Sequence, residues 1–269
     1  MATVDGFARR AISRGELWLA DGFEHAVDEL GLDQLSRWEE RLSSGVPAGR
    51  GNVAFVETAQ GPLVLKQLRR GGVAGPLWRE RFPSRRRLLD NLMLPALARE
   101  RGVRTPPAIA LLLVPSGPAL WRGWLAIQAV LDAVPLSERI GDDPPEHDEW
   151  VAALAAVRGL HDAGFDHPDL NLGNLLVGPD GGVWVIDLDR CRVREQGLEQ
   201  DGRITGIRRI ERSYHKTCFL RGVDPDPRID WLELYSGGDR SLDLRWGQRR
   251  DRDLARLRRH RSAWKRPSL

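Results

Sequence analysis

The stretch HPDLNLGNLLVGPDGGVWVIDLDR, residues 167–190, decides the fold of this chain. It contains two short apolar runs on either side of the sequence GPDGG, which is a dense turn signal. The two runs therefore predict a pair of strands joined as a hairpin. In that hairpin Val177 faces Val183. Leu175 then faces Val185, and the apolar side chains lie in the core.

The polar residues of this stretch gather at the open end of the predicted hairpin. The pairing places Asn174 beside Asp187, and the loop that contains Asp169 comes immediately before Asn174. Two carboxylates and a carboxamide are oxygen donors, which suit a hard cation such as Mg²⁺. An Asp left free of the metal would serve as a base for a hydroxyl nucleophile. Asx residues also cap turns at strand ends, but that interpretation explains each residue singly and not the ordered set.

The composition is that of a soluble globular protein in a reducing compartment. Of the 269 residues 41% are hydrophobic and 29% are charged, which argues against disorder and allows one large domain or two lobes. Cys191 and Cys218 have no metal-like spacing, so we expect no structural disulfide. The N-terminus lacks the apolar core of a signal peptide. The most apolar run, residues 108–114, is about a third of a membrane-spanning helix, so we expect a chain that is neither secreted nor membrane-spanning.

Positive charge is concentrated near the C-terminus. The net charge is only +3, yet residues 245–266 contain ten Arg or Lys against two Asp. This run indicates either a solvated helix face or attraction to an anionic surface or substrate, such as phospholipid or phosphate. No aromatic platform or zinc spacing accompanies the basic run, so we expect no nucleic-acid partner.

The first half of the chain predicts a lead-in and then a small, strand-rich lobe. Residues 1–36 are mixed in character and indicate short helices or turns. Residues 37–131 form the expected N-lobe, which begins with a Gly-rich loop. The runs 52–58 and 62–68 are strand-like, and a short Gln-Gly turn between them predicts a hairpin.

A helix and a further strand complete the expected N-lobe, and a larger lobe follows. The pattern predicts a helix over residues 84–101, which Pro95 should end or kink, and an apolar strand over 124–131. The second lobe, residues 132–269, should include a helix over 148–165, where apolar residues recur at three- and four-residue steps. The hairpin and a polar, mainly helical remainder come next.

Several motifs resemble those of a known family. HPDLNLGN resembles the catalytic loop of the protein-kinase-like fold, and VIDLDR resembles its metal-binding segment. HxDLNxxN followed by IDxDR is similar, more narrowly, to bacterial lipopolysaccharide core kinases, especially those acting on 3-deoxy-D-manno-octulosonic acid (Kdo). LKQLRRGGVAGPL at 65–77 and IRRIERSYHK at 207–216 resemble further stretches of that family. The resemblance extends from about residue 45 to residue 216.

The resemblance implies the fold and the chemistry of the second lobe. The fold would be α+β and bilobal, with a small antiparallel-sheet N-lobe and a larger, mainly helical C-lobe. Asp169 would be the catalytic base, and Asn174 and Asp187 would hold Mg²⁺ against the phosphates of ATP. Asn171 stands where protein kinases carry a Lys, so phosphate contacts there must differ. Arg190 would bind an acidic sugar or a phosphate, or form a structural salt bridge.

The histidines around this loop have structural interpretations. His167 would brace the catalytic loop through hydrogen bonds, and His161, late in the preceding helix, would be a satisfied core residue. Asp189 would support the loop or touch the metal.

The remaining candidates are expected to bind ATP. Lys66 lies in a strand on an apolar face, where a cation needs an anionic partner, and ATP phosphates would supply one. Three glycines, Gly45, Gly49 and Gly51, would form the loop over the phosphates. Kinase-like folds usually pair this Lys with a helix Glu, but RRRLLDNLML at the expected place contains only Asp90. This departure leaves open a nucleotide-binding pseudokinase that acts as a scaffold.

The function implied by the resemblance is ATP-dependent phosphorylation of a Kdo hydroxyl on the lipid A precursor. The partner would be Kdo-lipid A or a related anionic glycolipid, at the cytoplasmic face of the inner membrane. Basic residues 69–79, with Trp78, and the Arg-rich tail would contact that membrane peripherally. A heptose of the lipopolysaccharide core or a small molecule such as an aminoglycoside remains an alternative acceptor.

Overall fold

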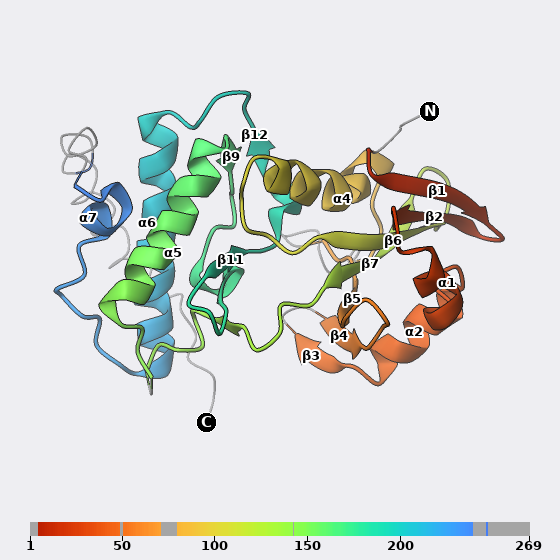
Figure 1. The fold of residues 1–269 in the computed structure, drawn as a ribbon, viewed down its shortest axis with the longest axis horizontal. Helices are drawn as coiled ribbons and strands as arrows, with labels where there is room; N and C mark the ends of the chain where they lie inside the picture. Colours follow the sequence, from red (N-terminus) through yellow and green to blue (C-terminus); the bar gives the residue numbers. More distant parts are fainter. Residues whose placement is uncertain (1–4, 49–50, 71–79, 142, 239–245, 247–269) are drawn as a thin grey trace. The chain divides into compact units, whose positions relative to one another are not determined.

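The computed structural model describes residues 5–48, 51–70, 80–141, 143–238 and 246 (Figure 1). The chain divides into two compact units. The first contains Met1–Arg99 and Pro106–Val130, and the second contains Glu100–Thr105 and Leu131–Leu269. The α+β class predicted from the sequence is confirmed, because a large antiparallel sheet dominates one unit and helices dominate the other.

The first unit is built on a seven-stranded antiparallel sheet with the order β1-β2-β6-β7-β5-β4-β3 (Figure 1). Its strands are β1 (Phe7–Ile12), β2 (Gly15–Ala20), β3 (Val46–Ala48), β4 (Gly51–Val56), β5 (Leu63–Gln67), β6 (Ala108–Pro115) and β7 (Trp121–Gln128). The hairpin predicted for β4 and β5 is confirmed, with Val56 paired to Leu63. The strand predicted over 124–131 is also present, as β7.

The lead-in predicted over residues 1–36 as short helices or turns does contain a short helix, but its earlier part belongs to this sheet. It forms β1 and β2, followed by α1 (Glu24–Leu30), and α2 (Leu35–Ser43) begins at its end. The sequence hides β2 because Leu17, Trp18 and Leu19 are all buried, so the strand lacks the alternation of a half-exposed one.

Helices cover both faces of the sheet. On one face Val27 of α1 and Trp38 of α2 join a core with Leu65 of β5. On the other face Leu88 and Leu92 of α4 (Arg85–Glu100) pack against strands of the same sheet. The two cores bury the middle of the sheet, chiefly β2, β6 and β7.

Helix α4 confirms the helix predicted over 84–101, and of the two effects expected of Pro95, an end or a kink, the end does not occur, because the helix continues to Glu100. Leu88, Leu89, Leu92 and Ala98 are buried along it. This packing offsets the backbone hydrogen bond that Pro95 cannot donate. At its first turn Arg85 forms an ion pair with Glu16, whose Oε2 lies 2.7 Å from Nη2 of Arg85.

The second unit contains three α-helices and short strands within its described part (Figure 1). The elements are β8 (Val134–Pro135), α5 (His147–Asp162), β9 (Phe165–Asp166), the 3₁₀ turn η1 (Leu172–Asn174), β10 (Leu175–Val177), β11 (Val183–Val185), η2 (Leu188–Arg190), β12 (Arg192–Val193), α6 (Gln200–Arg221) and α7 (Trp231–Ser236). Strands β11, β10 and β8 form one sheet, and β12 pairs with β9. No described helix has the length and apolar character needed to span a membrane.

The segment Glu100–Thr105 belongs to the second unit by its contacts. Arg101 donates to the carbonyl oxygen of Ala163 at 2.8 Å, and the amide of Val185 donates to the carbonyl oxygen of Arg104 at 2.9 Å. These contacts join residues far apart in sequence. The predicted N-lobe of residues 37–131 includes Glu100–Thr105, whereas the contacts assign this segment to the second unit.

Helix α5 confirms the helix predicted over 148–165, with somewhat shifted ends. A capping box starts it, because the side chains of Glu146 and Glu149 each accept a backbone N–H of the other. It closes at Gly164, whose φ is +85° and where an added Cβ would lie 2.4 Å from the carbonyl oxygen of Arg194.

Candidate active site

The hairpin predicted for the quoted stretch is present in the predicted register. Val177 pairs with Val183, and Leu175 pairs with Val185. Beyond the last strand pair, the amide of Ile186 donates to the carbonyl oxygen of Asn174 at 3.0 Å. The open end of the hairpin therefore brings Asn174 next to Ile186 and, one residue on, to Asp187.

The loop before β10 is closed by its own carboxamides. Nδ2 of Asn174 donates to the carbonyl oxygen of Asp169 at 3.0 Å, and Nδ2 of Asn171 donates to the same oxygen at 2.6 Å. Oδ1 of Asn171 accepts the amide of Gly173 at 2.9 Å. Asn171 is thus used at both ends within the turn. Because Nδ2 of Asn174 is held by Asp169, its Oδ1 is the end that suits a hard cation.

Asp187 adopts a left-handed backbone conformation, with φ of 65° and ψ of 43°. Non-glycine residues in this region are uncommon and cluster at functional sites. Here the conformation turns the chain from the end of β11 into η2.

The pKa of His167 is affected by the charges around its imidazole. It is buried, and Nε2 lies 3.2 Å from the carbonyl oxygen of Ile186, so the predicted bracing hydrogen bond is confirmed. Burial lowers the pKa of His167, while the hydrogen bond to Ile186 and the negative charges of Asp187 and Asp169 act in the opposite direction. Both carboxylates therefore act on the same imidazole.

Helix α6 supports the loop through two residues to which the sequence assigned no role. Nη1 of Arg209 donates to Oδ1 of Asp166 at 2.9 Å and to the carbonyl oxygen of His167 at 3.1 Å. Oγ of Ser213 accepts the amide of Leu172 at 3.1 Å. The stretch IRRIERSYHK, noted above only as a resemblance, was the signal that could have identified them.

Arg190 forms an ion pair with Asp169. Its Nη1 lies 2.7 Å from Oδ2 of Asp169, and the two side chains are 53% and 48% exposed. Of the alternatives that the sequence left open for Arg190, a salt bridge is therefore present, and its partner is the candidate base.

His161 is a satisfied core residue, as predicted. Its Nδ1 lies 3.0 Å from the hydroxyl of Tyr235, and burial lowers its pKa from 6.5 to about 3. A Cβ at Gly206 on α6 would lie 2.4 Å from the His161 ring, so α5 and α6 approach closely there.

The first unit places the candidate nucleotide residues in the sheet and beside it. Lys66 is half-buried in β5, between Val53 of β4 and Leu125 of β7. Gly45 precedes β3, and a Cβ there would lie 2.3 Å from the carbonyl oxygen of Val53, so only glycine allows this approach.

Two further positions complete the candidate phosphate loop. Gly51 opens β4, and Gly49 lies outside the described residues.

Asp90, the acid at the place where kinase-like folds usually carry a helix Glu, lies in α4. Burial raises its pKa against the effect of Arg87 and Arg86.

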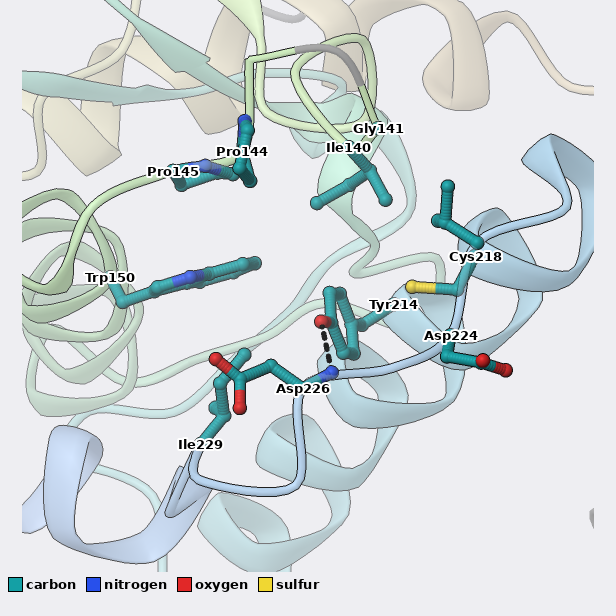
Figure 2. Close-up of a pocket in the computed structure, with 11 residues that line it drawn as sticks. Ile140, Gly141, Pro144, Pro145, Trp150, Tyr214, Cys218, Asp224, Asp226 and Ile229 are labelled. Carbon is teal, nitrogen blue, oxygen red and sulfur yellow. Dashed lines mark hydrogen bonds between the residues drawn. The ribbon is translucent and has the colours of Figure 1, made fainter.

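A separate pocket of about 250 Å³ lies in the second unit (Figure 2). Trp150 and Tyr214 form part of its wall, and the Tyr214 hydroxyl accepts the amide of Asp226 at 3.0 Å, as the dashed line in Figure 2 shows. Burial raises the pKa of Tyr214 to about 12. The pocket is lined by none of the residues at the open end of the hairpin, so it is distinct from the candidate active site.

The metal-binding donors are few. Among the described residues, no three His, Cys, Asp or Glu side chains lie together in an arrangement that could hold a metal ion. One carboxylate and one carboxamide are nevertheless a sufficient protein contribution for Mg²⁺, which keeps several waters and takes further oxygens from substrate phosphates. The donors present therefore fit Mg²⁺.

Comparisons with known proteins agree with this geometry. The model of the lipopolysaccharide kinase (Kdo/WaaP) family matches residues 36–237. The 3-deoxy-D-manno-octulosonic acid kinase of Xylella fastidiosa strain M12 is 31% identical over 226 residues, which cover 82% of this chain and 86% of that protein. The enzyme of the same name from Vibrio cholerae serotype O1 is 30% identical over 185 residues, covering 67% of this chain and 77% of that protein.

A solved structure shares the fold. WaaP in complex with acyl carrier protein matches with a TM-score of 0.51 at 18% identity, over 88% of this chain and 98% of that one. At this identity the likeness concerns the fold alone, which is consistent with a bilobal kinase-like architecture.

Proposed function

The chain belongs to the lipopolysaccharide kinase (Kdo/WaaP) family, and from that premise we propose that it transfers the γ-phosphoryl group of ATP to a hydroxyl of Kdo on the lipid A precursor. Membership makes it a phosphotransferase that acts on a sugar hydroxyl. The curated relatives described above are both named for Kdo, which favours this acceptor over a heptose or an aminoglycoside.

The observation that carries the proposal is the open end of the hairpin. Asp169 presents a half-exposed carboxylate, and the backbone of Asn174 is bonded to the residue before Asp187. In the reaction the acceptor hydroxyl oxygen bonds to the γ-phosphorus, and the bond from that phosphorus to the ADP oxygen breaks. The hydroxyl proton passes to the carboxylate of Asp169.

Asn174 and Asp187 would hold Mg²⁺ in this reaction. When bound, the ion neutralises charge on the phosphate oxygens. The two residues supply Oδ1 and a carboxylate, and the loop hydrogen bond from Nδ2 of Asn174 to Asp169 fixes which end of the carboxamide is presented. An intact set of these residues weighs against a pseudokinase scaffold.

Lys66, Gly45, Gly49 and Gly51 are proposed to bind the ATP phosphates. The half-buried position of Lys66 between two strands supports this role, because a phosphate is a suitable anionic partner for a partly desolvated ammonium group. The close approach of Gly45 to Val53 supports a backbone-lined turn beside it.

Peripheral contact with the cytoplasmic face of the inner membrane is also proposed. The acceptor is an anionic glycolipid, and the basic run at 245–266 would attract an anionic surface. Arg69 forms an ion pair with Glu80 at 3.6 Å, whereas residues 71–79, with Trp78, and all of the tail except Trp246 lie outside the described residues.

The test is mass spectrometry of Kdo-lipid A in anionic phospholipid vesicles, incubated with the protein, ATP and Mg²⁺. We expect a Kdo-lipid A product that carries one added phosphate, and no product from a heptose-terminated acceptor or an aminoglycoside. Phosphate on the heptose or the aminoglycoside alone would reject Kdo as the acceptor. Protein that stays wholly in the supernatant when the vesicles are pelleted would reject the membrane contact.

A further inference from the structure

Two side chains at the catalytic loop that could bind a phosphate already form hydrogen bonds that hold the loop. Asn171 is bonded at both ends inside the loop, and Arg209 is bonded to Asp166 and to the His167 carbonyl. Both side chains are engaged in holding the loop. Beyond the proposed Mg²⁺ and Lys66, a further cationic partner for a phosphoryl group at this loop would come from another residue.

Arg190 is positioned to be that partner. Its contact with Asp169 uses one N–H of Nη1, and a guanidinium carries five N–H donors in a fixed fork. The side chain is 53% exposed, so the other donors remain accessible. Within the described residues Asp169 has no hydrogen bond at Oδ1, which leaves that oxygen for an acceptor hydroxyl.

The distances typical of phosphoryl transfer would place the transferred phosphoryl group close to Arg190. An acceptor hydroxyl bonded to Asp169 places its oxygen about 3 Å from the carboxylate, and reacting atoms approach to about 3–3.5 Å. The transferred group then lies beside the carboxylate that Arg190 already contacts at 2.7 Å. Its equatorial oxygens carry the transition-state charge, which the planar guanidinium can bind through paired N–H donors.

We propose that Arg190 is a catalytic residue that contacts the transferring phosphoryl group while it pairs with Asp169. The inference rests on the proposed function, because it takes Asp169 as the base. In this role Arg190 stabilises the charge on the phosphoryl oxygens as the bond to the acceptor oxygen forms and the bond to ADP breaks. It does not accept or donate a proton.

The first test separates direct action from action through Asp169. Arg190→Gln should lower kcat for transfer to Kdo-lipid A by about 100-fold, the order found when a charge-stabilising donor is removed. The KM values for ATP and for the acceptor should change by less than about threefold, since the contact matters in the transition state. In an Asp169→Asn background the same change should lower the residual rate at least about tenfold further.

The second test does not need turnover. Calorimetry should show that Arg190→Gln binds ADP as the wild type does, but binds ADP with aluminium fluoride, a mimic of the transferring phosphoryl group, at least about tenfold more weakly. Arg194→Gln is the matched control, because Arg194 is 62% exposed and only loosely paired with Glu199 at 4.0 Å. It should leave both affinities and kcat unchanged.

Three results would overturn the proposal. No further loss in the Asp169→Asn background would make Arg190 only a positioning residue for the base. A raised acceptor KM with unchanged kcat would make it an anchor for the acceptor. Unchanged affinity for the fluoroaluminate complex would exclude contact with the phosphoryl group. A wild type that phosphorylates no sugar acceptor would instead contradict the proposed function itself.

Discussion

Asp187 is held in a left-handed backbone conformation at the end of a strand, with φ of 65°. For a non-glycine residue such a conformation costs about 1–3 kcal/mol and persists only where the surroundings enforce it. The surroundings here are the bond between the Ile186 amide and the Asn174 carbonyl on one side and η2 on the other. The negative charge of Asp187 acts against the lowering of the His167 pKa by burial.

The protonation of His161 should make the stability of the chain depend on pH. Its pKa is about 3 in the folded chain against an ordinary value of 6.5, chiefly through burial, with Arg203 acting in the same direction and Asp166 against it. Between these two pKa values, the imidazole of His161 is protonated in the unfolded chain but not in the folded chain. The free energy of unfolding should fall as pH drops below about 6.5, by up to about 1.4 kcal/mol per pH unit, until the folded pKa is reached.

Urea unfolding at pH 7 and pH 5 measures this effect. The wild type should lose about 2 kcal/mol more than a His161→Gln variant over this interval. His147→Gln is the control, because His147 is exposed at the start of the same helix, and it should behave as the wild type. Equal losses in the wild type and His161→Gln would show that His161 is not the buried neutral group described here.

Residues within one local turn could be predicted from the sequence, and those joined by tertiary contacts could not. Asn174 and Asp187 are brought together by a hairpin whose turn, GPDGG, lies between them. The contact of Arg209 with Asp166 spans 43 residues and depends on how α6 packs. The pairing of Arg190 with Asp169 depends on the turn at Asp187, which no local pattern indicates.

At the scale of elements, α6 supports the proposed catalytic loop. Arg209 holds the start of the loop and Ser213, one helical turn later, holds the amide of Leu172. The two contacts lie on one face of the helix, because residues four apart share a face. Loop geometry is therefore tied to the position of one helix.

Replacing Ser213 by Ala should test this support. The variant leaves the Leu172 amide without its partner, so it should lose about 1 kcal/mol of stability and, with a looser loop, roughly tenfold in kcat. Thr217→Ala is the matched control, because Thr217 bonds only to the Ser213 carbonyl within the helix. Steady-state kinetics and urea unfolding of both variants give the comparison. Identical kinetics in the two variants would contradict a role of α6 in holding the loop.

Some elements differed from expectation for physical reasons. The strand β2 has buried residues on both faces, so alternation does not indicate it, and its pairing with β6, more than 90 residues away, has no local signal. Helix α4 is present over the predicted range, but it does not end at Pro95, because its buried leucines offset the lost hydrogen bond. Both cases are tertiary contacts that override a local rule.

At the scale of the whole molecule, the chain combines a sheet unit with a helical unit that contains the proposed catalytic loop. The family match over residues 36–237 includes parts of both units. Lys66 lies in the first unit, and Asp169 lies in the second. The residues proposed for nucleotide binding and for proton removal therefore lie in different units of the chain, and separate variants should affect the two functions separately.

The most direct measurement compares phosphate transfer and ATP binding in two single variants. With radiolabelled ATP and Kdo-lipid A, Asp169→Asn should lower transfer by about 10²–10⁴-fold, the range for a general base, while calorimetry shows ATP affinity within about twofold of the wild type. Lys66→Gln should weaken ATP binding itself. Transfer that is unchanged in Asp169→Asn would contradict the account, because the hairpin end would then not be the site of phosphoryl transfer.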